Sequence, residues 1–210
     1  MEKTVLIHCI GDSHSFMFRG PAAPLMGYHA AGDLKTLSGV LDPEGGSPVN
    51  PPFMVHWLGP RTAYNFDRRK AVVDEILRRF WKEGDRVMFV AGEIDCREHL
   101  PKQAKKQNRP VEDLARECMD KFFDFVCGYK KYGLIVYFVV PTTMNGDDCR
   151  RASSECNKRL TERAALDNLP FIGLYEEMCT MTKDWYCDGT HLDYRIALPL
   201  VEEKLKGLGI

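Results

Sequence analysis

Five runs of hydrophobic residues recur along the chain, each bounded by turn residues. They cover residues 4–10, 53–58, 86–91, 134–140 and 170–174. Short apolar runs between turn residues are typical of strands that are buried on both faces. We therefore predict five buried strands.

Helical periodicity fills the stretches between these runs. The pattern covers residues 67–81, 111–129, 151–168 and 194–206. A helix over 67–81 places Ile76, Leu77 and Phe80 on one face. The basic, polar stretch 102–109 lacks such a face, so we expect a solvated loop there.

Strands that alternate with helices predict the fold class. A right-handed connection between parallel strands needs a crossover, usually a helix, so helices come to cover both faces of the sheet. The prediction is an α/β protein, a three-layer α/β/α sandwich around a central, mostly parallel five-stranded sheet. Residues 20–52 break this rhythm because they are rich in Gly and Pro, and we interpret them as a long excursion near the active face.

Composition and charge narrow the class of protein. The 210 residues, 44% of them hydrophobic and 28% charged, suit one globular domain over 1–210. With a net charge of -1, the chain lacks the excess of positive charge that binding to nucleic acid or to an anionic membrane requires. No apolar stretch is long enough for a membrane span or a secretory signal, so we expect a cytoplasmic protein. The eight cysteines lack zinc-site spacing, and we expect reduced, mostly buried thiols.

Two short motifs carry the candidate chemistry. Gly11-Asp12-Ser13-His14 ends the first predicted strand, which puts a serine at the carboxyl edge where ligands bind in open α/β sheets. A serine hydroxyl needs a neighbouring base, and Asp188-Gly189-Thr190-His191 near the other end offers both a base and an acid to orient it. The candidate catalytic residues are Ser13, Asp188 and His191.

The order and placement of these motifs resemble the SGNH (GDSL-like) hydrolase family. That family carries its nucleophile in a GDS motif after the first strand and a DxxH motif before the last helix, as in Gly11-Asp12-Ser13 and Asp188-Gly189-Thr190-His191. The resemblance implies esterase or acyltransferase chemistry without a cofactor. It also implies an oxyanion hole built from the backbone N–H groups of Ser13 and of a glycine after the second strand, which Gly59 matches.

One family feature is missing. After the third strand the family has a GxND block whose asparagine donates to the oxyanion, whereas this chain reads Gly92-Glu93-Ile94-Asp95. Isoleucine cannot donate a hydrogen bond. The loss of one donor costs about 10²- to 10³-fold in turnover if nothing replaces it. The site therefore has a substitute donor, works with two donors, or is impaired.

Four side chains just past predicted strands are candidate substitute donors or substrate contacts. They are Arg97, Arg61, Asn65 and Asn145. We favour Arg97 because a guanidinium is always charged and suits an oxyanion or a carboxylate. An ion pair of Arg97 with Glu93 or Asp95 is the alternative. Pro60 follows Gly59 and predicts an extended conformation for it, with its N–H left to donate.

Several other polar and aromatic residues have structural interpretations that we favour or leave open. We expect Asp12 to hydrogen-bond its own turn and no histidine pair to bind metal. The histidines in question are His8, His14, His56 and His99. The aromatic residues Trp57, Tyr64 and Phe66 either line a pocket for a sugar or acyl chain or pack in the core.

The working hypothesis is a serine esterase that removes a small acyl group, such as acetyl, from a small or carbohydrate ester. The acyl-enzyme on Ser13 can instead pass its acyl group to a glycan hydroxyl, which is O-acyltransferase chemistry. A different class of protein, a glycan-binding module with impaired catalysis, also fits the altered third block. A metal-dependent enzyme using Asp12, Asp95 and Asp188 is the weakest reading.

Overall fold

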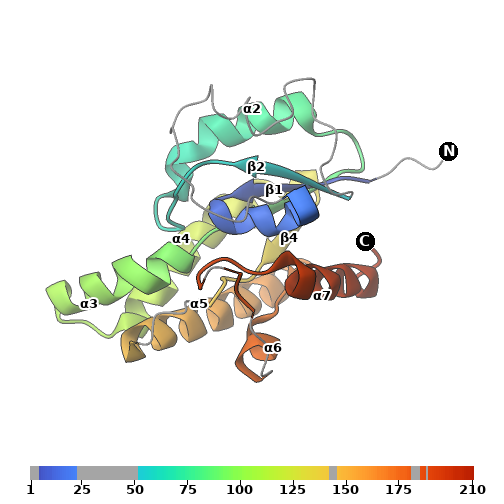
Figure 1. Ribbon diagram of the computed structural model, residues 1–210. Coiled ribbons are helices and arrows are strands. Elements are labelled where there is room, and N and C mark those ends of the chain that lie inside the picture. Colours follow the sequence, from blue (N-terminus) through green and yellow to red (C-terminus); the bar gives the residue numbers. More distant parts are fainter. Residues whose placement is uncertain (1–4, 23–51, 142–145, 181–184, 188) are drawn as a thin grey trace.

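The computed structural model describes residues 5–22, 52–141, 146–180, 185–187 and 189–210 (Figure 1). Its sheet has five strands, each at a predicted hydrophobic run, in the order β2-β1-β3-β4-β5. The strands are β1 (Ile7–Gly11), β2 (Phe53–Trp57), β3 (Arg86–Val90), β4 (Leu134–Tyr137) and β5 (Phe171–Ile172). Every neighbouring pair is parallel, which confirms the predicted sheet.

Two hydrophobic cores, one on each face of the sheet, confirm the three-layer arrangement. One core packs the sheet against α2 (Lys70–Phe80), α3 (Leu100–Gln107), α4 (Val111–Cys127) and α5 (Asp147–Leu166). The other packs it against the 3-10 helix η1 (Ser13–Ala22) and α7 (Tyr194–Gly207). Neighbouring residues of β1 point to opposite cores, Cys9 to the second and Ile10 to the first.

Four further short helices complete the described part of the chain. They are η2 (Phe66–Arg69), the π-helix η3 (Asp95–His99), η4 (Lys130–Tyr132) and α6 (Tyr175–Thr180). No helix in the described ranges is long and apolar enough to cross a membrane. Five of the eight cysteines are buried, as predicted, and all eight are free thiols. The predicted excursion over 20–52 falls almost wholly outside the described residues.

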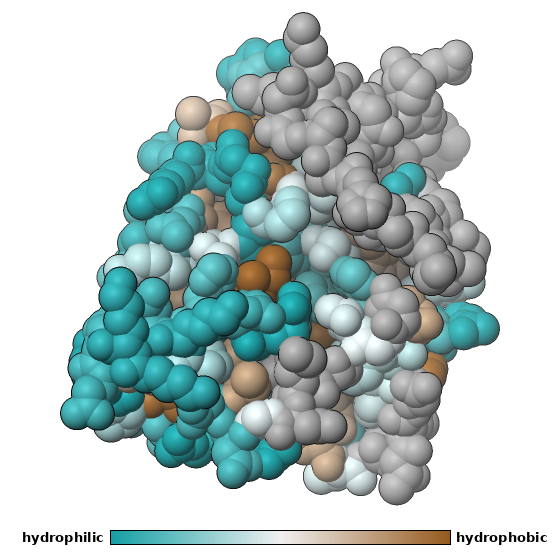
Figure 2. Space-filling model, turned by 60° about the vertical axis from the view of Figure 1, so that its left-hand side comes forward, coloured by the Kyte–Doolittle hydropathy of each residue, from teal (hydrophilic) through white to brown (hydrophobic). Residues whose placement is uncertain are grey.

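The prediction of a loop over 102–109 is wrong, because most of this stretch belongs to α3. Leu100 and Ala104, one helical turn apart, are buried, and Pro101 occupies the first turn, where a proline is tolerated. The lysines point to solvent. Figure 2, with the α3 end of the molecule turned forward, shows mostly polar side chains over this end. The apolar stripe is too narrow to stand out in a basic sequence.

A pair of histidines lies buried between the sheet and α2. The rings of His8 on β1 and His56 on β2 stack with centroids 5.2 Å apart, and His8 Nδ1 lies 2.9 Å from His56 Nε2. His8 Nε2 faces Asp85 Oδ2 at 3.4 Å. Burial, and then the charge of His8, lower the pKa of His56 to about 3. The expectation of packed histidines is therefore correct for both.

This pair predicts acid sensitivity. The unfolded chain protonates His56 near its ordinary pKa of 6.5, whereas the folded chain keeps it neutral down to about 3. The stabilisation is therefore complete above pH 6.5. It falls as the pH decreases from 6.5 toward about 3, by at most about 1.4 kcal/mol per pH unit. Urea unfolding of His56→Phe between about pH 7.5 and pH 5 should show a shallower loss than the unsubstituted protein. His99→Gln, which removes an exposed histidine, should not change the slope.

Candidate active site

The carboxyl ends of three adjacent strands meet at one point. Gly11 stands in register with Trp57 of β2 and with Val90 of β3. Leu58 N donates to Gly11 O at 2.7 Å, and Asp12 N donates to Val90 O at 3.1 Å. Since β1 connects to β2 on one side while β3 lies on the other, this is the switch point at which open α/β sheets bind ligands.

In the Gly-Asp-Ser turn, close packing requires the glycine, and the aspartate forms hydrogen bonds that stabilise the turn. A Cβ on Gly11 would stand 2.0 Å from Val90 O, so no other residue fits there. Asp12 Oδ1 accepts from His14 N at 2.9 Å, and the Asp12 carbonyl accepts from Ser15 N and Oγ. The predicted structural role of Asp12 is confirmed.

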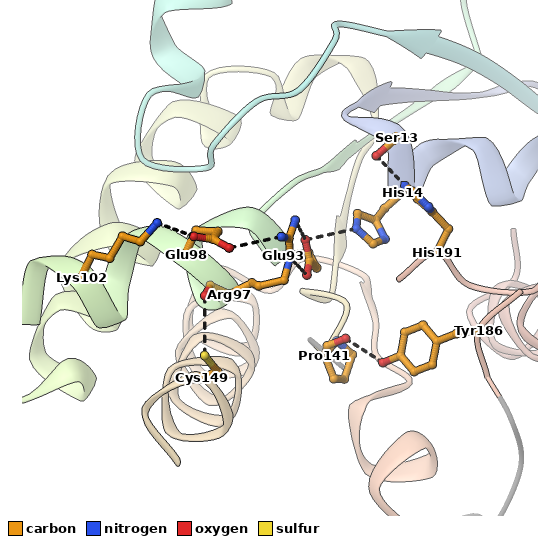
Figure 3. Close-up of polar contacts among 10 residues, drawn as sticks. All are labelled: Ser13, His14, Glu93, Arg97, Glu98, Lys102, Pro141, Cys149, Tyr186 and His191. Carbon is orange, nitrogen blue, oxygen red and sulfur yellow. Dashed lines mark hydrogen bonds and ion pairs between the residues drawn. The ribbon is translucent and has the colours of Figure 1, made fainter. Parts of the chain in front are cut away.

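Ser13 and His191 lie within hydrogen-bonding distance although they are 178 positions apart in sequence. His191 Nε2 is 2.8 Å from Ser13 Oγ (Figure 3). This is the distance at which an imidazole can take a hydroxyl proton. Asp188, the third predicted catalytic residue, lies outside the described residues.

A short hairpin presents His191. Tyr186 and Leu192 form an antiparallel bridge, and Cys187 N donates to His191 O at 2.9 Å. Tyr186 Oη donates to Pro141 O at 2.6 Å, which ties the hairpin to the segment that follows β4 (Figure 3). The Tyr186 side chain therefore anchors the hairpin that carries His191 to the segment after β4.

The two glycines of the loops beside Ser13 both have positive φ. Gly59 has φ +80°, so the extended conformation that Pro60 predicts for it is wrong. Gly92 has φ +115°, and a Cβ there would lie 2.8 Å from a methyl of Val139. Both positions therefore favour glycine for conformational reasons alone.

The third block follows β3 and begins η3. Ile94 is half-buried, and its side chain has no donor. Asp95 Oδ2 accepts from Ala63 N at 2.6 Å, which ties the loop after β2 to η3. Burial raises the pKa of Asp95 to about 6. Like Asp12, Asp95 therefore accepts a hydrogen bond from a backbone N–H group. In the described part of the chain, no three His, Cys, Asp or Glu side chains are grouped to hold a metal ion.

Arg97, the favoured substitute donor, is already paired. Its Nε lies 2.7 Å from Glu93 Oε1 and its Nη2 3.3 Å from Glu93 Oε2. The predicted alternative, an ion pair with Glu93, is what the structure contains. Asn65 precedes η2 without a side-chain cap bond, Arg61 lies beside Gly59, and Asn145 falls outside the described residues.

His14 is a site residue whose role the sequence analysis did not find. The residue is only 4% exposed, its ring centroid lies 5.0 Å from that of His191, and its Nε2 is 3.5 Å from Glu93 Oε2 (Figure 3). Burial lowers the pKa of His14, but the contact with Glu93 and the charge of Asp12 outweigh it, and the net direction is upward. A chain of polar contacts thus runs from the buried His14 through the buried Glu93 to the half-buried Arg97.

The aromatic residues near Gly59 do not share a pocket. Trp57 packs against Phe16 in one core, whereas Phe66 is fully buried in the core on the opposite face. Tyr64 is 50% exposed, with Lys121 Nζ 4.3 Å from its ring centroid. Core packing is the correct interpretation for Trp57 and Phe66.

No protein-family model matches the chain, and no curated protein sequence matches it. Solved structures do match over nearly the whole length. One is a member of the lipolytic protein G-D-S-L family from Veillonella parvula, with a TM-score of 0.58, 14% identity and 97% of each chain covered. The chain has the fold of the GDSL (SGNH) hydrolases. This finding confirms, at the level of fold, the resemblance drawn from Gly11-Asp12-Ser13 and Asp188-Gly189-Thr190-His191.

Two further structures share this SGNH-type fold. A catalytic mutant of Axe2, an acetylxylan esterase from Geobacillus stearothermophilus, has a TM-score of 0.57 at 17% identity, covering 100% of this chain and 97% of its own. LAE5, an alpha/beta hydrolase enzyme from the metagenome of Lake Arreo, has a TM-score of 0.57 at 13% identity, and the match covers 97% of this chain and 96% of LAE5.

Proposed function

We propose that the protein is a serine esterase whose acyl-enzyme forms on Ser13. The observation that carries this proposal is the 2.8 Å contact between Ser13 Oγ and His191 Nε2 at the switch point of the sheet. His191 takes the hydroxyl proton while Oγ attacks the ester carbonyl. The same imidazolium then protonates the leaving alkoxide. Water, deprotonated by His191, releases the acid and restores Ser13.

Asp188 is the proposed third member, which holds the imidazole in the tautomer that leaves Nε2 to accept the proton. Its spacing from His191 supports this role. The structural neighbours add support, because Axe2 structures described as catalytic mutants replace a serine, an aspartate and a histidine. These are the same three residue types.

The backbone N–H groups of Ser13 and Gly59 are the proposed donors to the tetrahedral oxyanion. Gly59 lies one residue after Leu58, whose N–H is already bound to Gly11 O, so the two loops are close neighbours. Arg97 is already paired with Glu93, and the side chain of Ile94 has no hydrogen-bond donor. This favours an oxyanion hole with two backbone donors. The proposed substrate is a small acyl ester, such as an acetyl group on a carbohydrate, on the analogy of the acetylxylan esterase neighbour.

The deciding test is turnover of p-nitrophenyl acetate together with labelling by a fluorophosphonate probe. We expect hydrolysis, and a covalent adduct on Ser13 identified by peptide mass analysis. No turnover and no adduct, with the fold intact by circular dichroism, would favour the glycan-binding module instead. Product analysis with added sugar acceptors distinguishes hydrolysis from O-acyl transfer, because net transfer with little free acid contradicts a simple esterase.

Restoring the family asparagine should raise activity. Ile94→Asn adds an amide donor at the block that follows β3, and a donor of this kind is worth up to about 10²- to 10³-fold in turnover. We expect a rise in kcat for p-nitrophenyl acetate of about 10²-fold, the lower end of that range. Ile94→Leu, which keeps the apolar volume without a donor, is the matched control. An unchanged kcat in Ile94→Asn would mean that another group already fills the place of the third donor.

A further inference from the structure

The guanidinium of Arg61 folds back over the loop that carries Gly59. Its Nη2 stands 3.6 Å from where a Cβ of Gly59 would be, and its Nη1 donates to Pro60 O at 2.9 Å. The Pro60 carbonyl thereby holds one of the two terminal nitrogens of the guanidinium. The rest of the guanidinium stays beside the proposed oxyanion glycine.

Arg61 and Arg69 lack the acidic partners that most other arginines have. Among the described residues, no carboxylate forms an ion pair with either, and Arg61 Nε is shut off from water without a hydrogen-bond acceptor. Burial, and then the charge of Arg69, lower the pKa of Arg61. The arginines with acidic partners are Arg78, Arg79, Arg97, Arg109, Arg116, Arg150, Arg151, Arg159, Arg163 and Arg195.

A guanidinium that is partly buried and has no counter-ion among the described residues is stabilised when an anion binds beside it. Among the residues that the structure describes, the nearby acids have other partners: Asp67 at the start of η2 is paired with Lys121, and Asp95 accepts from the backbone of Ala63. Within the described part of the chain, the charge of Arg61 beside Gly59 therefore remains uncompensated.

We propose that Arg61 binds a carboxylate on the body of the substrate, so that the preferred substrates are acyl esters of acidic sugars such as uronic acids. This inference rests on the proposed esterase function. A guanidinium fork matches a carboxylate with two parallel hydrogen bonds. The position of Arg61 suits the substrate body better than the oxyanion, because it lies on the Cβ side of Gly59, whereas the oxyanion is bound by N–H groups.

The test compares two substrates that differ only in charge. One is an O-acetylated methyl glucuronoside, and the other is its uronamide, in which a neutral amide replaces the carboxylate. We expect kcat/KM to be about 10- to 100-fold higher for the acid, the range that charge-assisted hydrogen bonds provide, with the difference mainly in KM. Added salt should reduce the preference because the guanidinium is partly exposed.

Arg61→Gln should bring the ratio of acid to amide close to one, and Arg61→Lys should leave an intermediate ratio because it keeps the charge without the fork. Arg68→Gln is the matched control: it removes an exposed charge one residue from Arg69 and should leave the ratio unchanged. Competitive inhibition of the unsubstituted protein by free methyl glucuronoside gives a measure that needs no variant. Equal kcat/KM for the two substrates, or a preference that survives in Arg61→Gln, overturns the proposal, whereas absent hydrolysis of p-nitrophenyl acetate overturns the esterase function itself.

Discussion

Ser13→Ala and His191→Ala are each expected to lower kcat for an ester substrate by about 10⁴- to 10⁶-fold. The reason is the single hydrogen bond between Ser13 Oγ and His191 Nε2, since the hydroxyl is a weak nucleophile without the imidazole. Backbone donors and substrate binding remain in both variants, so a residual rate above that in water should persist.

The double variant makes this prediction sharper. Because Ser13 and His191 act as one unit, removing both should cost little more than removing either. Steady-state kinetics with p-nitrophenyl acetate, on protein whose thermal unfolding midpoint matches that of the unsubstituted chain, provides the measurement. His99→Ala, at an exposed position on η3, is the control. Losses that multiply in the double variant would contradict a shared mechanism, and full activity in Ser13→Ala would remove Ser13 as nucleophile.

The fold was predictable because its signals are local. Each buried strand is a separate hydrophobic run, and alternation with helices leaves few topologies once crossovers are right-handed. The exception, α3, shows the limit of this signal. Its buried stripe consists of Leu100, Pro101 and Ala104, which is too little apolar surface to stand out among lysines.

The candidate site was predictable only where motif and chain position coincide. Ser13 and His191 are in contact as expected, because Ser13 follows the first strand and His191 precedes the last helix, two elements that the pattern indicates. For Arg97 the structure contains the predicted alternative, an ion pair with Glu93, and the spacing of four residues on a helical stretch was the signal for it. The contact of His14 with Glu93 had no such signal, since it joins the ends of two different strands.

Three buried ionisable groups and the half-buried Arg97 lie together beside Ser13. When all are ionised, Glu93 and Asp12 are anions and His14 and Arg97 are cations, so the four charges balance. Burial raises the pKa of Asp12 to about 6, against the charge of His14 and its backbone hydrogen bond. The balance depends on Glu93, because it is the one group that contacts both cations.

Glu93→Gln should therefore destabilise the protein by about 3 to 5 kcal/mol, the usual cost of leaving buried charges unpaired. Burial raises the pKa of Glu93, but His14 and Arg97 outweigh it and lower the value, so its stabilisation is present above the ordinary 4.5 and lost below it. The raised pKa of His14 makes its own contribution complete below the ordinary 6.5 and lost as pH rises through the raised value.

The loss in Glu93→Gln should consequently be largest between about pH 5 and pH 6.5, where both members of the pair are charged. Urea unfolding across pH measures it. Glu98→Gln is the matched control, because Glu98 also contacts Arg97 but is partly exposed, and surface pairs contribute about 1 kcal/mol or less. If the two variants lose the same free energy of unfolding, the contacts of Glu93 with His14 and Arg97 contribute no more than a surface pair does.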